Sequence, residues 1–224
     1  MRDLIIMFDT LKADLGAVME RDPAARNKLE VFFLYSGYKA VRKYRRAHWF
    51  QTHNMKFIAR WLSQRARHKT GVEIHPGATI GKGLVIDHGM GVVIGETTVI
   101  GDNCLIYQNV TLGGTGKDQG KRHPTLGNNV LVGSGAKVLG PFRVGDNARI
   151  AAGAVVLTEV PENATAVGVP AKVVRVGGEK VDCASRSLDQ IHYTDPVAKQ
   201  LEEIETKLNE LKNTVDGFEN GAGI

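Results

Sequence analysis

From Gly71 onward, aliphatic residues recur at every sixth position, and this period constrains the fold more than any other feature of the chain. An α-helix would need a period near 3.6 residues, and a β-meander would alternate with a period of two. Neither agrees with a spacing of six. The aliphatic positions fall into three runs, which are Ile74, Ile80 and Ile86, then Ile94, Ile100, Ile106 and Leu112, then Leu126, Val132, Val138, Val144, Ile150 and Val156.

A small or β-branched residue usually follows each aliphatic position after four residues, as at Ala78, Thr98 and Ala136. One inward aliphatic residue and one small corner residue suit a short strand plus a turn, and three such units close a triangular coil. Glycine supplies 26 of the 224 residues and aromatic residues only 6%, which favours tight corners over large side chains. We therefore predict a parallel β-helix over residues 71–176.

The period is interrupted twice, and insertions in a stacked repeat leave the body as loops where function concentrates. From Ile86 to Ile94 the spacing is eight residues, and from Leu112 to Leu126 it is fourteen. The first interruption contains Asp87 and His88. The second carries a glycine-rich stretch followed by Lys121, Arg122 and His123. Both segments are therefore candidate sites.

Residues 1–70 have a different pattern, in which apolar residues such as Leu4, Phe8, Leu11 and Leu15 recur at helical spacing. We predict an N-terminal α-helical domain here, so the fold class is α+β. Asp22 before Pro23 is typical of a helix N-cap with proline at the first helical position, which predicts that a helix restarts at this point.

After the repeats, residues 177–224 form a predicted C-terminal tail. Asp195 and Pro196 resemble another cap, and apolar residues at alternating spacings of four and three predict a helix over 196–215. A trimeric coiled-coil seam and packing against the body are both compatible with this pattern.

The net charge of +5 favours anionic ligands, although ten Lys or Arg and no acid between residues 39 and 69 are also typical of a solvated helix face. That segment has no nucleic-acid-binding motif, so we expect no nucleic acid partner.

The chain has two cysteines, which do not support a disulfide framework and favour a reducing compartment. No apolar run is long enough for a signal sequence or a membrane span. We expect a cytoplasmic protein.

His88 is the first candidate for a catalytic residue. Glu73 lies fifteen residues earlier, close to the roughly eighteen residues of one coil, so its carboxylate can lie one level away from the imidazole. A carboxylate and an imidazole can act as orienter and general base for a hydroxyl nucleophile. A histidine that only hydrogen-bonds within a turn is the alternative.

The sequence closely resembles the serine O-acetyltransferases, which are acyltransferases of the hexapeptide-repeat superfamily. The resemblance covers about residues 10–176. The motifs that carry it are Arg21-Asp22-Pro23-Ala24, Ala47-His48-Trp49, Ile74-His75-Pro76, Ile86-Asp87-His88-Gly89, Gly95-Glu96-Thr97, Leu112-Gly113-Gly114-Thr115-Gly116-Lys117, Arg122-His123-Pro124 and Gly168-Val169-Pro170-Ala171.

The resemblance implies a left-handed β-helix and transfer of an acetyl group from acetyl-CoA to L-serine, the first step from serine to cysteine. It makes His88 the general base. The family usually has aspartate where this chain has Glu73, so the orienting carboxylate is one methylene longer. Asp22 and Asp87 match positions that hold the serine ammonium, and Arg122 and His123 match positions that meet its carboxylate.

The resemblance also implies that acetyl-CoA lies in a groove between coils of neighbouring subunits, which requires a homotrimer. The short stretch before Asp22 leads us to expect a trimer rather than a dimer of trimers. The terminal Ile224 matches the residue with which family members bind O-acetylserine sulfhydrylase. The positions implied for the cofactor are Gly114, Thr115, Ser134, Ala152 and Gly153, with Lys172 close to its phosphates.

Three other functions are alternatives to serine acetylation. Another hexapeptide acyltransferase could use a sugar, an antibiotic or an amino-sugar nucleotide as acceptor, but two carboxylates with Arg122 and His123 favour a zwitterionic amino acid. A β-helix hydratase of the γ-carbonic anhydrase type needs three histidines around zinc. His75, His88 and His123 lack the closely spaced pair, so we expect no metal. A noncatalytic binding protein is the third alternative.

Overall fold

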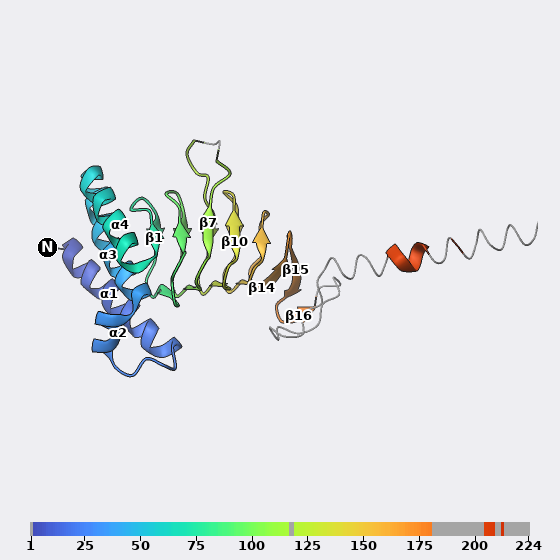
Figure 1. The fold of residues 1–224 in the computed structure, drawn as a ribbon, viewed down its shortest axis with the longest axis horizontal. Coiled ribbons are helices and arrows are strands. Elements are labelled where there is room, and N and C mark those ends of the chain that lie inside the picture. The colour runs from blue at the N-terminus through green and yellow to red at the C-terminus, as the bar shows by residue number, and fades with distance from the viewer. Residues whose placement is uncertain (1, 117–118, 181–203, 209–211, 213–224) are drawn as a thin grey trace, which may run out of the picture. The chain divides into compact units, whose positions relative to one another are not determined.

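The computed structural model describes residues 2–116, 119–180, 204–208 and 212 (Figure 1). The chain divides into two units, residues 1–180 and 181–224. In the second unit residues 204–208 and 212 are helical, and the other residues of the helix predicted over 196–215 lie outside the described residues. Ile224 also lies outside them.

Four helices precede the repeats, with bounds α1 Arg2–Arg21, α2 Lys28–Leu34, α3 Ser36–Thr52 and α4 Lys56–Thr70. The predicted restart of a helix at Asp22 and Pro23 is wrong, because residues 23–27 are not helical and α2 begins only at Lys28. The Asp22 carboxylate accepts the N–H of Ala24 at 2.8 Å within an isolated turn. The cap of α2 is Asn27, whose side chain accepts the N–H of Glu30 at 2.9 Å. None of the described helices is long and apolar enough to cross a membrane.

The repeats form three sheets that wrap around one axis, so the body is a three-sided parallel β-helix (Figure 1). The β1–β13 sheet contains β1 Glu73–Ile74, β4 Val93–Ile94, β7 Thr111–Gly113, β10 Lys137–Leu139 and β13 Val155–Val156. The β2–β11 sheet contains β2 Thr79–Ile80, β5 Val99–Ile100, β8 Thr125–Leu126 and β11 Arg143–Val144. The β3–β16 sheet contains β3 Val85–Ile86, β6 Leu105–Ile106, β9 Leu131–Val132, β12 Arg149–Ile150, β14 Ala164–Gly168, β15 Ala171–Val176 and β16 Glu179–Lys180.

The strand register shows how both interruptions are accommodated. Glu73 pairs with Val93, twenty residues later, and Thr111 pairs with Lys137, twenty-six residues later. Where no insertion intervenes, the offset is eighteen residues, as between Val93 and Thr111. The extra residues therefore leave as loops while the coils remain in register. The longer loop projects from the body between β7 and β10 (Figure 1).

The core is a column of aliphatic side chains along the axis of the β-helix, and all thirteen sixth-position residues predicted from the period are buried. Small buried residues such as Ala136, Ala148 and Ala154 lie at the corners. Asparagines at positive φ make the turns along one edge, where Asn129 donates to Asn147 at 3.1 Å and Asn147 donates to Asn163 at 3.0 Å. The period-six prediction is confirmed.

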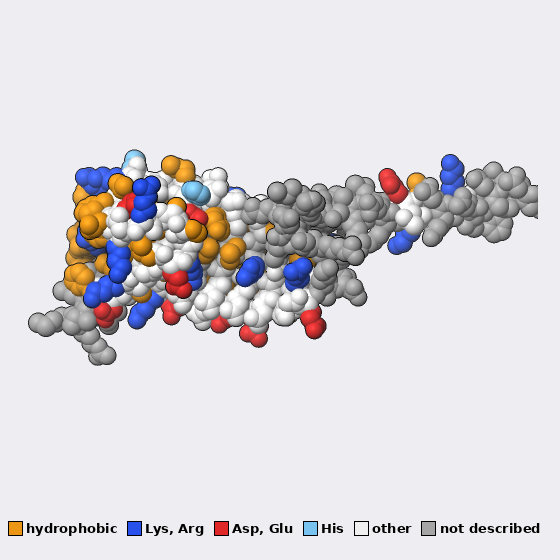
Figure 2. Space-filling model, turned by 90° about the horizontal axis from the view of Figure 1, so that it is seen from below, with side chains coloured by type: hydrophobic (Ala, Val, Ile, Leu, Met, Phe, Trp, Pro, Cys, Tyr) orange, Lys and Arg blue, Asp and Glu red, His pale blue; other side chains and the backbone are white. Residues whose placement is uncertain are grey.

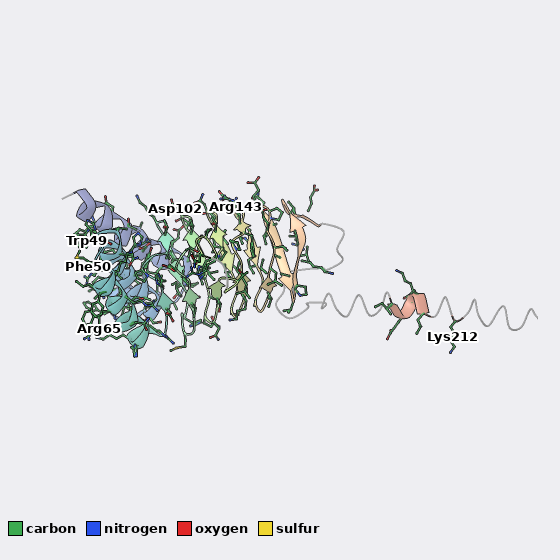
Figure 3. The ribbon with its side chains drawn as sticks, turned by 90° about the horizontal axis from the view of Figure 1, so that it is seen from above. Trp49, Phe50, Arg65, Asp102, Arg143 and Lys212 are labelled. Atoms are coloured by element: carbon green, nitrogen blue, oxygen red, sulfur yellow. The ribbon has the colours of Figure 1, made fainter. Side chains whose placement is uncertain are left out.

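The helices cover the N-terminal end of this column. The Tyr44 hydroxyl on α3 donates to the carbonyl of Ala78 at 2.5 Å. Arg45 contacts the carbonyls of Ile80 and Gly81 and pairs with the fully buried Asp14 of α1 at 3.2 Å. Trp49, Phe50 and Arg65 project at this helical end, whereas Asp102 and Arg143 project from the coils (Figure 3).

Three edges connect the sheets, and two of them matter for function. The His88 edge leads from the β3–β16 sheet to the β1–β13 sheet and comprises residues 87–92, 107–110, 133–136 and 151–154. The loop edge leads from the β1–β13 sheet to the β2–β11 sheet and comprises residues 75–78, 95–98, 114–124 and 140–142.

Candidate active site

A cavity of about 370 Å³ lies where the helices meet the first coil. Asp22, from the turn after α1, and Asp87 and His88, from the end of β3, line it together with Tyr35 and Tyr107. Residues from the helical domain and from the β-helix thus contribute to one site. The structure thus brings the predicted site residue Asp22 to the predicted pair Asp87 and His88, which lies far from it in sequence.

Two carboxylates, of Asp22 and Asp87, line this cavity together with the side chain of Arg21. Tyr35 hydrogen-bonds to Asp22 and lies in the field of Asp87. Burial, the Asp22 hydrogen bond and the neighbouring carboxylates raise the pKa of the Tyr35 hydroxyl, so it stays protonated and can donate. Two carboxylates supply the hydrogen-bond acceptors and the negative charge that suit an ammonium group.

His88 is held in place by its own backbone. It adopts a φ of +55°, and Gly89 follows at +81°, so the chain turns sharply into the cavity. The Ser36 hydroxyl, at the start of α3, donates to the His88 carbonyl at 2.8 Å. A Cβ on Gly37 would lie 1.9 Å from the Ile86 carbonyl oxygen, so only glycine lets α3 approach this strand so closely. The start of α3 therefore fixes the position of the histidine.

Glu73, the predicted orienter, is held differently. Its carboxylate pairs with Arg67 at 3.2 Å and Arg60 at 3.5 Å, both on α4. Within the described part of the chain, no hydrogen bond joins Glu73 to His88. The two arginines provide the only ion pairs of this carboxylate among the described residues.

Arg122 and His123 lie on the loop edge, outside the cavity that holds His88. Arg122 donates to the Glu96 carboxylate at 2.6 Å, which lowers the pKa of Glu96. Lys121 donates to the carbonyls of Thr97 and Pro124. This end of the long loop is thus bound to the segment Gly95–Thr97 on the coil before it.

Two histidines on the loop edge share the same electrostatic character. Burial lowers the pKa of His75, and burial together with Arg122 lowers the pKa of His123. Gly77 donates its N–H to Nδ1 of His75 at 3.0 Å. Both rings are therefore neutral near pH 7 and can serve as hydrogen-bond donors through Nε2.

The positions predicted for the cofactor are also divided between the two edges. Ser134, Ala152 and Gly153 follow one another along the His88 edge, where Gly153 donates to the Ser134 carbonyl at 2.8 Å. Gly114 and Thr115 lie on the loop edge, and Lys172 lies exposed on β15. A Cβ on Gly153 would meet nothing within 4 Å, so the backbone there faces open space.

Several contributing residues had no distinct signal in the sequence. Tyr35 and Ser36 lie in a helical segment without a motif, and only the packing of α3 on β3 brings them to the cavity. Glu96 and Thr97 belong to a motif that carried the resemblance, although their contacts with the long loop depend on the strand register. Among the described residues, no three His, Cys, Asp or Glu side chains are arranged to hold a metal ion.

The fold and this site define a transferase of the hexapeptide-repeat class. The family described as bacterial transferase hexapeptide (six repeats) matches residues 123–158, and the family described as serine acetyltransferase, N-terminal, matches residues 4–43.

Individual relatives make the assignment more specific. The serine acetyltransferase of Synechococcus elongatus is 52% identical over 212 residues, covering 95% of this chain and 85% of that protein. The serine acetyltransferase of Bacillus subtilis is 49% identical, covering 92% and 94%. The crystal structure of Neisseria gonorrhoeae serine acetyltransferase in complex with serine matches with a TM-score of 0.75 and 41% identity, covering 78% of this chain and 72% of that one. The chain belongs to the serine acetyltransferase family, and its β-helix is left-handed.

Proposed function

We propose that this protein transfers the acetyl group of acetyl-CoA to the hydroxyl of L-serine, giving O-acetyl-L-serine and CoA. The observation that carries the proposal is the convergence of Asp22, Asp87 and His88 in one cavity, where two carboxylates face the space beside an imidazole. An amino acid offers the matching groups, an ammonium for the carboxylates and a hydroxyl for the base. The product is an activated form of serine from which cysteine is made.

His88 accepts the proton of the serine hydroxyl while the oxygen attacks the thioester carbonyl. The C–S bond then breaks, and the imidazolium returns its proton to the leaving thiolate, so the enzyme ends the cycle unchanged. The turn at His88 and the Ser36 contact hold the backbone that carries the ring.

Glu73 is the proposed orienter of His88, and its two arginine partners set the condition for this role. To reach the imidazole, the carboxylate must exchange Arg60 or Arg67 for the ring. Replacing Glu73 with glutamine keeps the shape and removes the charge, so kcat falls if the carboxylate stabilises the imidazolium. An unchanged kcat in Glu73→Gln assigns Glu73 to the α4 ion pairs alone.

The second half of the serine site is Arg122 and His123, which we assign to the substrate carboxylate. A guanidinium and a neutral ring donor are suited to a carboxylate, whereas Asp22 and Asp87 would repel one.

The two halves of the serine site lie on different edges of the β-helix, so we propose that a homotrimer completes each site from two chains. Exposed apolar side chains on α4, Phe57, Ile58 and Trp61, support association between chains, and Figure 2 shows apolar side chains gathered over the helical end.

Acetyl-CoA would then lie between the His88 edge of one chain and the loop edge of the next. Ser134, Ala152 and Gly153 would line one wall and Gly114 and Thr115 the other, with Lys172 toward the phosphates. Small residues let the pantetheine arm approach the backbone, and Gly153 faces open space. The reaction requires no metal. We place the protein in the cytoplasm, where the buried Cys104 stays a free thiol.

We further propose that the terminal Ile224 binds O-acetylserine sulfhydrylase, the enzyme that consumes the product. The support is the resemblance of the chain terminus to that of family members. Deleting Ile224 should abolish binding of the sulfhydrylase in a pull-down or by calorimetry and leave acetyl transfer intact. Undiminished binding after the deletion overturns this partner.

The reaction is tested by thiol release from acetyl-CoA with L-serine, L-homoserine, a galactoside or no acceptor. We expect release with serine that is lost in His88→Ala, while His68→Ala, an exposed histidine on α4, behaves like wild type. Removal of a general base costs about 10²–10⁴-fold in rate. Release with another acceptor but not with serine would keep the chemistry and overturn the substrate. No release with any acceptor would favour a noncatalytic binding protein.

A further inference from the structure

The long loop is attached to the preceding coil residue by residue. Gly95 lies beneath the ring of His123, Glu96 pairs with Arg122, and Thr97 contacts the next residues of the loop through its backbone and its hydroxyl. A Cβ on Gly95 would lie 2.0 Å from Cδ2 of His123 and 2.1 Å from Nε2. The ring therefore rests directly on the glycine and is 8% exposed.

The hydrogen bonds of Thr97 determine the protonation of this ring. A hydroxyl accepts two hydrogen bonds and donates one. The Thr97 hydroxyl accepts the N–H of Arg122 at 3.0 Å and that of His123 at 3.1 Å, so its proton remains for Nδ1 of His123, 2.9 Å away. The Thr97 N–H donates to the same Nδ1 at 3.2 Å. Both contacts require Nδ1 to be unprotonated.

We propose that Thr97 is a positioning residue that locks His123 in the neutral Nε2–H tautomer, so that Nε2 is the one donor of this ring. Protonating Nδ1 would break both contacts with Thr97, and a second cation would lie next to Arg122. A ring locked in this way donates to a carboxylate at every pH at which it stays neutral, whereas a free histidine would switch between two tautomers.

The identity of the bound carboxylate rests on the proposed function, but the tautomer does not. It can be read in the full-length protein without substrate from the ¹⁵N shifts of labelled histidine rings. We expect an unprotonated Nδ1 and a protonated Nε2 for His123 in the wild type and in Thr97→Ser, which keeps the hydroxyl. Thr97→Val should show a mixture of tautomers and a raised pKa of His123, while Thr79→Val, an exposed threonine on β2, should match the wild type.

Kinetics then connect the lock to binding. In Thr97→Val the KM for serine should rise by about tenfold while the KM for acetyl-CoA stays within about twofold of the wild type, and Thr97→Ser should restore the KM for serine. A protonated Nδ1 in the wild type, or an unchanged ring spectrum in Thr97→Val, overturns the lock. The wild-type spectrum alone decides the tautomer if Thr97→Val does not fold. A changed spectrum with an unchanged KM for serine supports the lock and contradicts carboxylate binding by His123.

Discussion

Single side chains on the loop edge have less freedom than their place beside a long loop would indicate. His123 contacts Gly95 and Thr97, Lys121 donates to the Thr97 carbonyl, and Arg122 is fixed by Glu96. Four residues of the second coil and the loop thus position the two side chains that we assign to the substrate carboxylate. Substitution of a residue that never touches the substrate can therefore impair its binding.

Gly95→Ala should show this effect. The added methyl overlaps the His123 ring, which must leave its place, so kcat/KM for serine should fall by about 10–100-fold, as when a hydrogen bond to a charged group is lost. The control is Gly16→Ala on α1, where a Cβ meets nothing within 4 Å, and helix propensity predicts a gain of about 0.5–1 kcal/mol in stability. Equal kinetics for the two variants would contradict the contact between Gly95 and His123.

The two buried histidines of the loop edge also predict how stability varies with pH. Their folded-state pKa values lie below the ordinary 6.5, so below that pH the unfolded chain takes up protons that the folded chain resists. The free energy of unfolding should fall as the pH drops from about 7.5 to 5.5, and less so in His75→Gln. Denaturant midpoints at fixed protein concentration measure this, and an identical pH dependence in both proteins would contradict it. Glu96, whose pKa is lowered by Arg122, stays ionised throughout that range.

Among the secondary structure elements, α1 depends most on one buried ion pair. Asp14 is fully buried, pairs with Arg45 of α3 at 3.2 Å and accepts the N–H of Gly83 at 2.9 Å. Burial raises the pKa of Asp14, and Arg45 and the N–H of Gly83 oppose this effect. This pair joins α1, α3 and the first coil.

Asp14→Asn should therefore loosen the attachment of α1. Leaving Arg45 without its counterion costs about 3–5 kcal/mol, measured as a lower unfolding midpoint together with faster proteolysis of α1. The double variant Asp14→Leu, Arg45→Met removes both charges and should be less destabilised than Asp14→Asn. A midpoint for Asp14→Asn equal to that of the wild type would show that the pair does not hold α1.

Some secondary structure elements could be predicted from the sequence and others could not, for physical reasons. The spacing of Ile94, Ile100 and Ile106 predicts the strands, because each short strand buries a single residue. The helix predicted after Asp22 is wrong because this carboxylate caps only an isolated turn at Ala24, and the side chain that caps α2 belongs to Asn27. The contacts between Thr97 and His123 could not be predicted, because they depend on how far the long loop folds back onto the coil.

Across the whole molecule, the separation of His88 from Arg122 and His123 predicts that activity depends on the proposed trimer. A mixture of two inactive variants, His88→Ala and Arg122→Ala, should regain activity when the chains are refolded or expressed together. In a cyclic trimer that contains both chains, about one site in three combines an intact His88 with an intact loop from the neighbour. Each variant alone is the control. A mixture that remains inactive would place the complete site within one chain, and a solution mass near six chains would overturn the simple trimer.

Both ends of the β-helix are covered by elements that do not belong to the regular coils. The four helices close the first coil, and at the other end β14, β15 and β16 pair antiparallel, which breaks the parallel repeat with strands that no further coil can extend in register. A parallel stack with open ends would present its backbone hydrogen bonds to other molecules and could polymerise end to end into fibres. The helices and the antiparallel strands thus prevent end-to-end polymerisation of the chains. A change that unpairs β15 from β14 would expose a strand edge that could template filaments.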